Sequence, residues 1–155
     1  MELKILHGNL QDIKVDTLLI NLFEGTEVTS GVTGAIDKAL GGAVSDLLVG
    51  GDMSGKAGEV GVIYSRGAIS ARRVIVVGLG KPDSIDLEGI RKAAAAGIKR
   101  ARELKAHQVA TVVPSGLNPD ISLASASQAI AEGSLLALYR YDAMKHSEDP
   151  KHDIQ

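Results

Sequence analysis

The stretch from residue 15 to residue 42 constrains the fold of this chain most. Within it, Thr17–Phe23 is an apolar run long enough for a strand buried on both faces. A polar loop follows, and apolar residues then recur at helical spacing over residues 32–40, with Ser30 as the expected N-cap and Gly41-Gly42 as the expected end. Open α/β sheets bind ligands where such a loop leads from a strand into a helix N-terminus. The alternative is that the glycines only permit a tight crossover.

The rest of the chain alternates between strand-like and helix-like segments. A link of a few residues around Arg66-Gly67 joins two strands and predicts an antiparallel pair, because a parallel crossover needs a dozen or more residues. The second of these strands, VIVVGLG at 74–80, is the most apolar and is expected to be central. The whole order predicts an α/β fold with three α/β/α layers and a mixed sheet. The two strands beside the Arg66-Gly67 link are expected at 59–65 and 73–78, and further strands at 3–7 and 109–113. Helices are expected at Ala43–Val49, at 87–106 with Asp86 as N-cap, and at 118–141.

Composition narrows the possible functions. The chain has 155 residues, enough for one domain with a proper core, and a net charge of −2 that gives no overall attraction to nucleic acid or to an anionic membrane. Without cysteine it can form neither disulfides nor thiolate metal sites. No apolar run approaches the ~20 residues of a membrane span, and the N-terminus lacks the features of a signal peptide. We therefore expect a cytoplasmic protein.

Familiar catalytic and nucleotide-binding motifs are missing. Gly78 and Gly80 follow a strand, but Pro82 and Asp83 stand where a dinucleotide fingerprint needs small residues and its third glycine. There is no P-loop sequence and no Gly-x-Ser-x-Gly elbow. The histidines are scattered, so we expect no zinc site built from this chain alone; they are His7, His107, His146 and His152. Asp37 is expected to be a solvated charge on the first helix.

One helix carries a basic strip that could contact phosphates. Its residues fall within roughly 140° of arc at about 100° per residue. A solvated face explains the strip equally well, and no aromatic residues interleave to stack on bases. Nucleic acid is therefore not an expected partner, and a free-standing scaffold or nucleic-acid-contacting protein is only a third possibility. The strip consists of Arg91, Lys92, Lys99, Arg102 and Lys105.

Four blocks of sequence carry a resemblance to a known family. They are VDTLLINLFEG, GVTGAIDKALGG, RRVIVVGLGK and SQAIAEGSLLALYRYDAMK. In this order and at this spacing they resemble the N-terminal domain of the M17 leucyl aminopeptidases over residues 1–145. The resemblance implies a macro-domain-like α/β/α fold. It also implies a C-terminal catalytic domain as partner, with two divalent metals (zinc or manganese) that serve to release N-terminal amino acids from peptides, and a hexamer when full length.

The catalytic part of that family has no counterpart in this chain. Its metal and catalytic residues, including the NTDAEGRL motif, belong to the C-terminal domain, and none of them occurs here. No catalytic or metal-binding residue is therefore carried over, and we expect this chain alone to be inactive. Residues 146–155 are polar and are expected to be a loose tail or an interdomain linker. The sequence allows either an excised piece or a stand-alone protein, with a role in assembly or in access to the active site.

A second resemblance suggests an alternative function. VDTLLIN, a glycine-bearing loop and GAIDKALGG are similar to the ADP-ribose-binding segment of macro domains, and Asn21 matches the first asparagine there. The residues at 22–24 replace the small residues and second asparagine of that segment. The alternative is thus a macro-like module that binds ADP-ribose or a nucleotide. Its expected ligand-binding residues are Asn21, Gly31, Thr33, Gly34 and Gly78.

Overall fold

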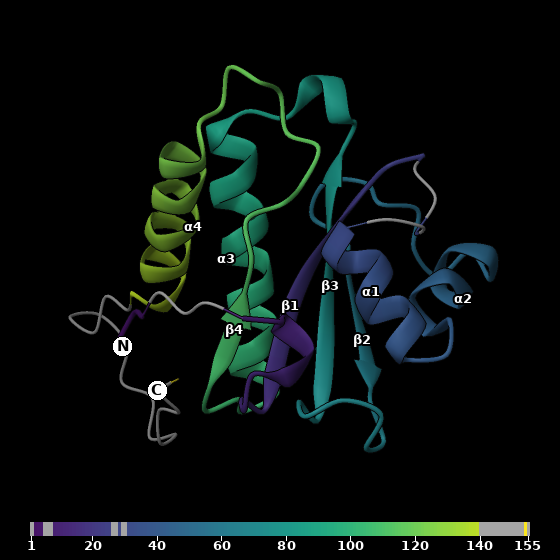
Figure 1. Cartoon of the computed structure of the whole chain (residues 1–155). Coiled ribbons are helices and arrows are strands. Elements are labelled where there is room, and N and C mark those ends of the chain that lie inside the picture. The colour runs from purple at the N-terminus through teal and green to yellow at the C-terminus, as the bar shows by residue number, and fades with distance from the viewer. Residues whose placement is uncertain (1, 5–7, 26–27, 29–30, 140–153, 155) are drawn as a thin grey trace.

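A computed structural model describes residues 2–4, 8–25, 28, 31–139 and 154, and its described part contains a four-stranded sheet between helices (Figure 1). The strands and helices alternate along the chain much as the sequence predicts. The strands are β1 (Thr17–Phe23), β2 (Val60–Tyr64), β3 (Arg73–Gly80) and β4 (Val109–Thr111). The helices are α1 (Gly31–Ala39), α2 (Ala43–Val49), α3 (Leu87–Glu103) and α4 (Leu123–Leu138), with short 3-10 turns η1 (Leu10–Asp12) and η2 (Pro82–Ser84).

The sheet is mixed, in the order β2-β3-β1-β4. β1 runs parallel to both of its neighbours, so that Leu19 lies opposite Ile75 of β3 on one side and Thr111 of β4 on the other. β2 pairs with β3 in antiparallel register, from Val60 opposite Val77 to Tyr64 opposite Arg73. The predicted antiparallel pair and the central place of the 74–80 strand are both confirmed.

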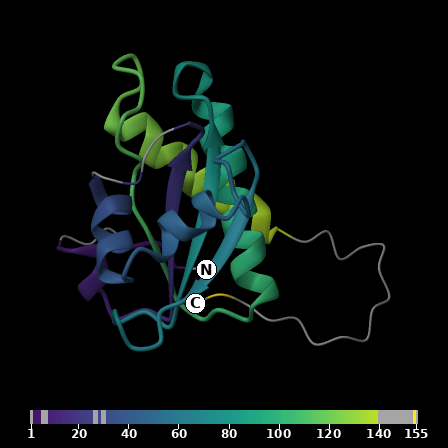
Figure 2. The ribbon, with the colours of Figure 1, turned by 90° about the vertical axis from the view of Figure 1, so that its right-hand side faces the viewer.

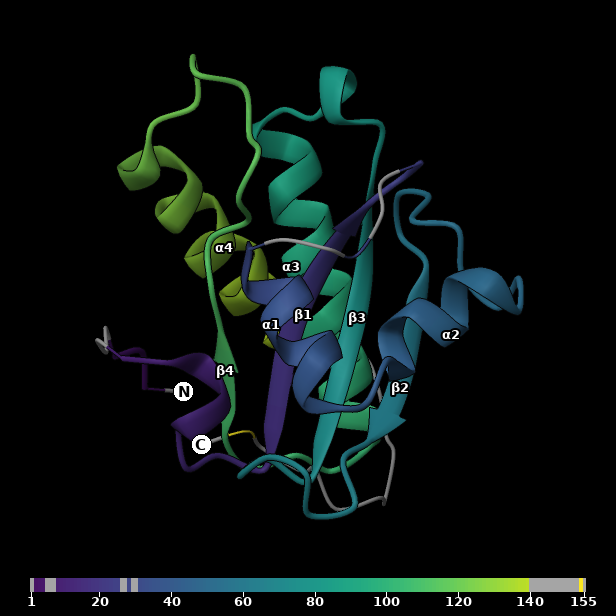
Figure 3. The same ribbon diagram turned by 45° about the vertical axis from the view of Figure 1, so that its right-hand side comes forward.

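Helices cover both faces of the sheet, which confirms the three-layer architecture. α1 and α2 lie on one face and α3 and α4 on the other, as Figures 1 and 3 show from two directions. A hydrophobic core lies on each face of the sheet, and alternate side chains of the central strands belong to one or the other. Leu18 belongs to the same core as Ile36 on the first face, and Leu19 to the same core as Ile90 on the second. Every residue of β3 is buried, as expected for a strand with cover on both faces.

The helices on the second face pack closely because glycine occupies the contact positions. A Cβ at Gly97 would overlap the Leu19 side chain of β1, and one at Gly133 of α4 would overlap the backbone carbonyl of Arg91. The start of α3 is fixed by its predicted cap, since the Asp86 carboxylate accepts a hydrogen bond from the Gly89 N–H at 2.7 Å. Small residues at these contacts therefore set the spacing between sheet, α3 and α4.

Some predicted boundaries are wrong. α4 begins at residue 123 and not at 118, because the Asn118 side chain accepts a hydrogen bond from the Asp120 N–H in a turn and Ser122 provides the N-cap. β4 ends at residue 111 and not at 113. α3 ends at residue 103, and Lys105 then adopts a left-handed φ of 58°.

Other predictions fall on residues outside the described part. Of the strand expected at 3–7, residues 3 and 4 are described and belong to no strand. The expected N-cap Ser30 and nearly all of the 146–155 tail lie outside the described residues. In that tail only Ile154 is described, and it is buried in the α3–α4 core. Figure 2 views the same ribbon from the side.

Candidate functional site

A cleft opens at the carboxyl ends of β1 and β4, beside the first turn of α1. Its volume is about 420 Å³. This is the edge at which parallel strands of open α/β sheets present ligand sites. Apolar side chains form most of the wall, and a few polar groups lie among them. The lining residues are Ile20, Asn21, Leu22, Phe23, Val28, Gly31, Val32, Thr33, Leu79, Val112, Val113, Pro114, Ser115 and Gly116.

The end of β1 and the start of α1 are joined directly at this cleft. The Thr33 hydroxyl donates a hydrogen bond to the backbone carbonyl of Asn21 at 2.8 Å. One residue later the register of β1 against β3 shifts between Leu22 and Phe23. The bond fixes α1 against the sheet, whereas no hydrogen bond joins the Asn21 carboxamide to another described residue. The end of β1 and the first turn of α1 are thereby tied together at the cleft wall.

The start of α1 also approaches the loop that follows β4. Gly31 has a φ of +67°, a conformation that side chains disfavour. A Cβ there would lie only 2.9 Å from the Ser115 hydroxyl oxygen. Glycine at position 31 is thus required by both backbone conformation and space. It brings the α1 N-terminus and the 112–116 loop together as opposite walls of the cleft.

The structure brings together three of the five predicted ligand-binding residues. Asn21, Gly31 and Thr33 line the cleft, whereas Gly34 and Gly78 are not among its lining residues. Gly78 lies under a loop, where a Cβ would overlap the carbonyl of Lys56. The Leu79 side chain stands in the cleft wall from the same strand. The ligand-binding role of all five residues remains a prediction.

Sequence reasoning missed the wall formed by residues 112–116. The signal was Pro114-Ser115-Gly116, which directly follows a strand parallel to β1. Since carboxyl ends of neighbouring parallel strands meet at one edge of the sheet, this segment had to lie beside Asn21. Phe23 also lines the cleft, and a Cβ on Gly116 would lie 3.7 Å from its ring.

The prediction for Asp37 is wrong, because this residue is buried. Its carboxylate accepts hydrogen bonds from the Val44 N–H at 2.8 Å, the Ser45 N–H at 3.0 Å and the Ser45 hydroxyl at 2.6 Å. The Gly41-Gly42 reversal folds the N-terminus of α2 back onto α1, and a helical periodicity cannot reveal this. Asp37 therefore caps the next helix and is not a solvated surface charge.

Other carboxylates are engaged by neighbouring groups. The Ser54 hydroxyl and N–H hydrogen-bond Glu59 and lower the pKa of its carboxyl. The pKa of the Glu132 carboxyl is lowered mainly by its hydrogen bond from Arg91 and to a smaller extent by its hydrogen bond from Gln128. The Asp16 carboxylate accepts from the Thr17 hydroxyl at 2.7 Å and from the backbone of the 107–108 segment. In the part of the chain that the structure describes, no three His, Asp or Glu side chains converge as metal ligands would.

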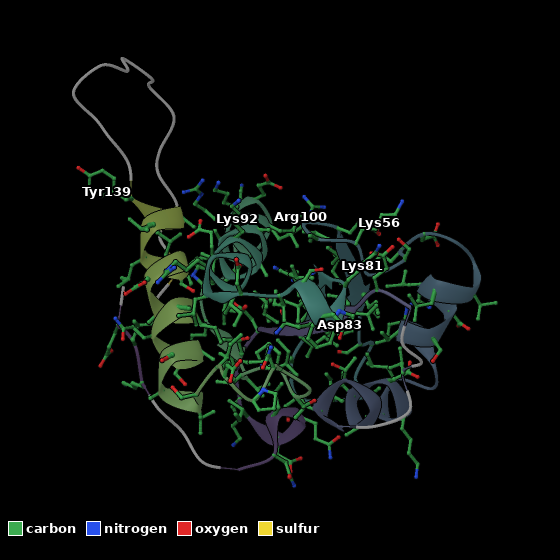
Figure 4. All side chains as sticks on the ribbon, turned by 90° about the horizontal axis from the view of Figure 1, so that it is seen from above. Lys56, Lys81, Asp83, Lys92, Arg100 and Tyr139 are labelled. Carbon is green, nitrogen blue, oxygen red and sulfur yellow. The ribbon has the colours of Figure 1, made fainter. Side chains whose placement is uncertain are left out.

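The basic strip on α3 is partly occupied by contacts with α4. Arg91 Nε donates to Glu132 at 2.7 Å, and Arg102 Nη1 donates to the carbonyl of Ala137 at 3.1 Å. Lys92 and Lys99 of the strip are exposed, and Figure 4 shows Lys92 extending outward from α3. The strip is thus divided between a helix–helix contact and a solvated surface. None of the described helices has the length and apolar character needed to cross a membrane.

Comparison with known proteins points to one family. Residues 19–148 match the model of the cytosol aminopeptidase family, N-terminal domain. A probable cytosol aminopeptidase of Roseiflexus castenholzii is 36% identical over 153 residues, which cover 97% of this chain and 28% of that protein. This chain thus spans less than a third of the length of the curated relatives that it matches first.

Solved structures with the same fold include a leucine aminopeptidase and macrodomains. A tomato leucine aminopeptidase superposes with a TM-score of 0.73 at 24% identity, over 94% of this chain and 29% of that chain. The macrodomain of Mycobacterium tuberculosis DarG reaches 0.69 at 15% identity, over 84% of this chain and 88% of its own. A Trypanosoma brucei macrodomain in complex with ADP-ribose superposes with a TM-score of 0.64 at 18% identity, over 84% of this chain and 55% of that chain. The predicted macro-domain-like fold is confirmed, and by its match over residues 19–148 the chain belongs to the cytosol aminopeptidase family as an N-terminal domain of that family.

Proposed function

We propose that this chain is a non-catalytic N-terminal domain of a leucyl aminopeptidase, a metallo-exopeptidase that releases N-terminal amino acids. Its role is in assembly of that enzyme or in access to its active site. The observation that carries the proposal is the match to the family's N-terminal domain over residues 19–148, in a chain that spans only 28% of the Roseiflexus castenholzii relative. The chemistry is therefore assigned to the remaining part of the full-length enzyme.

The side chains of this domain support a role without catalysis. Two-metal peptidase chemistry needs several carboxylates or histidines held around a pair of ions. The carboxylates of Asp16, Asp37, Glu59 and Glu132 are instead bound to neighbouring protein groups. The described residues do not fit a two-metal site, so no reaction step is derived on them. Two divalent metals, zinc or manganese, belong to the proposed catalytic part.

The proposal includes the partners that the resemblance implies. They are the C-terminal catalytic domain and further copies of the full-length protein in a hexamer, in the cytoplasm. Nucleic acid is not part of the proposal, because Arg91 and Arg102 of the basic strip already contact α4.

Titration of the chain with Zn²⁺ or Mn²⁺ by calorimetry tests the assignment of the metals. The scattered donors predict no site with a dissociation constant below a micromolar. Two equivalents of either metal bound more tightly than that would contradict the proposal. A matched titration with Ca²⁺, which prefers oxygen ligands, controls for nonspecific metal binding to surface carboxylates.

A second candidate function is binding of ADP-ribose or a nucleotide in the cleft. The observation that favours it is the 420 Å³ cleft at the carboxyl edge of β1 and β4, with Asn21 and Thr33 in its wall. A macrodomain of the same fold is solved in complex with ADP-ribose. Phe23 and Glu24 add bulk and negative charge at the end of β1, where a phosphate group would approach, and this disfavours the second candidate.

Titration with ADP-ribose, followed by backbone amide signals, tests the second candidate. The cleft predicts saturable shifts at residues 31–34, at residues 112–113 and at residues 115–116 (Pro114 has no amide proton), with one ligand bound per chain. Signals of α2 serve as the internal control and should not move. Unchanged signals at millimolar ADP-ribose would rule the second candidate out.

A further inference from the structure

Three large apolar side chains are exposed where α4 ends, and we name them the α4 patch: Leu135 and Leu136 in the last turn, and Tyr139 directly after the helix. Their exposed fractions are 48%, 70% and 72%. Leu135 and Leu136 are neighbouring outward positions of α4, and at Tyr139 the backbone turns from helical to extended. Figure 4 shows the Tyr139 side chain pointing away from the sheet and the helices. A cluster of this kind is typical of a contact surface.

The α4 patch differs from the outward face in the middle of the same helix. About two turns earlier the exposed positions are Ser127 and Gln128, which are polar, and at the start of the helix Leu123 is an exposed apolar residue. The inward face packs on α3 through Ala126, Ala129 and Gly133. The end of α4 is therefore apolar on both sides, whereas its middle is apolar only toward α3. Apolar residues around the whole helix indicate a second contact there.

α4 presents this patch in a fixed orientation. Arg102 of α3 donates a hydrogen bond to the carbonyl of Ala137, in the last turn of α4. Arg91 of α3 is paired with Glu132 one turn earlier. Both contacts hold the C-terminal half of α4 against α3, so the patch does not depend on a loose end. A partner meets a preformed surface and pays little in ordering entropy.

Size and position together indicate what covers the patch. Three side chains fall well short of the roughly 800 Å² per partner that a stable complex of separate chains buries. A tethered partner needs much less, because the tether provides an effective concentration on the order of millimolar. The family match ends at residue 148, shortly after α4, and more than two thirds of the Roseiflexus castenholzii relative lies outside the matched part.

We propose that the α4 patch is the docking surface for the polypeptide that follows this domain in full-length members of the family. The docking partner presents an apolar surface with a polar group for the Tyr139 hydroxyl. This inference rests on the proposed function, since it names the surface through which the domain joins the catalytic part.

Hydrogen exchange tests this inference in a fusion that places this chain in front of the unmatched part of the Roseiflexus castenholzii relative. Docking predicts that amides of residues 132–139 exchange at least tenfold more slowly in the fusion than in the chain alone. Leu136→Gln should restore the faster exchange. The matched control is Val49→Gln, at another apolar residue that is 88% exposed, and it should change nothing. Equal exchange in fusion and chain, for whatever reason, overturns the inference.

Sedimentation of the chain alone supplies a second test that needs no fusion. The chain and its Leu136→Gln variant should both sediment as monomers with the same melting temperature. A dimer that Leu136→Gln dissociates would make a second copy the occupant, and a lower melting temperature would show that the chain covers the patch itself. Either result overturns the inference. If the fusion hydrolyses leucine amide but the amides of residues 132–139 exchange as fast as in the chain alone, only the docking surface is contradicted. If the chain alone hydrolyses leucine amide, the proposed function is contradicted.

Discussion

The carboxylate of Asp37 in α1 binds Ser45 in α2 twice, through the serine N–H at 3.0 Å and its hydroxyl at 2.6 Å. Together with the Val44 N–H, this satisfies donors at the α2 N-terminus that have no partner within the helix. A negative charge at that position also complements the helix dipole. One side chain thus joins the two helices on the first face of the sheet.

Asp37→Ala should destabilise the chain by about 2–3 kcal/mol, because it leaves buried N–H groups without acceptors. The measurement is urea unfolding followed by circular dichroism. Asp46→Ala is the matched control, since Asp46 is an exposed carboxylate in the first turn of α2, the turn that Asp37 caps. Its loss should cost only about 0.5 kcal/mol through the helix dipole. Equal effects of the two substitutions would show that Asp37 is not a cap.

Gly133→Ala should destabilise the chain by about 1–2 kcal/mol, although alanine favours a helix by about 1 kcal/mol. The new methyl group would meet the Arg91 carbonyl, and this backbone group cannot move unless α3 and α4 separate. Gly97→Ala is the companion variant, because its obstacle is the end of the flexible Leu19 side chain. Thermal unfolding should rank Gly133→Ala as the more damaging. The reverse order would mean that α4 tolerates displacement.

The ion pair between Arg91 and Glu132 should make stability depend on pH in the acid range. Arg91 lowers the pKa of Glu132 in the folded chain, so the pair stabilises the fold above the unfolded-state value of about 4.3. That contribution is lost as the pH falls through the lowered folded pKa. Unfolding experiments should show Glu132→Gln less stable than the parent at pH 7, with a difference that shrinks as the pH falls below about 4.3. A difference that stays constant through the acid range would contradict the assignment, and 1 M salt should reduce the difference at pH 7.

If the cleft binds ADP-ribose, Asn21→Leu should weaken binding at least tenfold and leave the melting temperature within a few degrees. The substitution removes a carboxamide that bonds to no other described side chain, so the fold loses little. Calorimetric titration measures the affinity. Ser127→Ala on the exposed face of α4 is the control and should bind as the parent does. Unchanged affinity in Asn21→Leu would place the ligand elsewhere.

The central strands could be predicted because their signal is local. Thr17–Phe23 and the 74–80 run are apolar over their whole length, as strands with cover on both faces must be. The short link at Arg66-Gly67 similarly fixes the antiparallel pairing of β2 with β3. The four sequence blocks indicated the family, and with it the macro-domain-like fold.

Contacts between distant segments could not be predicted in the same way. Asp37 occupies a position on its helix that would face solvent if α2 did not fold back after Gly42. Gly78 follows the apolar run as a ligand-binding glycine would, yet the Lys56 carbonyl lies against it. The 112–116 wall of the cleft became evident only from the parallel pairing of β4 with β1. Gly78 and the cleft wall have neighbours that are remote in sequence, whereas the partners of Asp37 are seven and eight residues away, across a reversal of the chain.

Hydrolysis of leucine amide by the purified 155-residue chain tests the central claim most directly. The assay includes zinc or manganese and is run beside the full-length Roseiflexus castenholzii relative. Because metal-type peptidase chemistry needs ligands that converge around the ions, the account predicts no turnover above background with either metal. Turnover within about a hundredfold of the relative, retained through a further purification step, would contradict it.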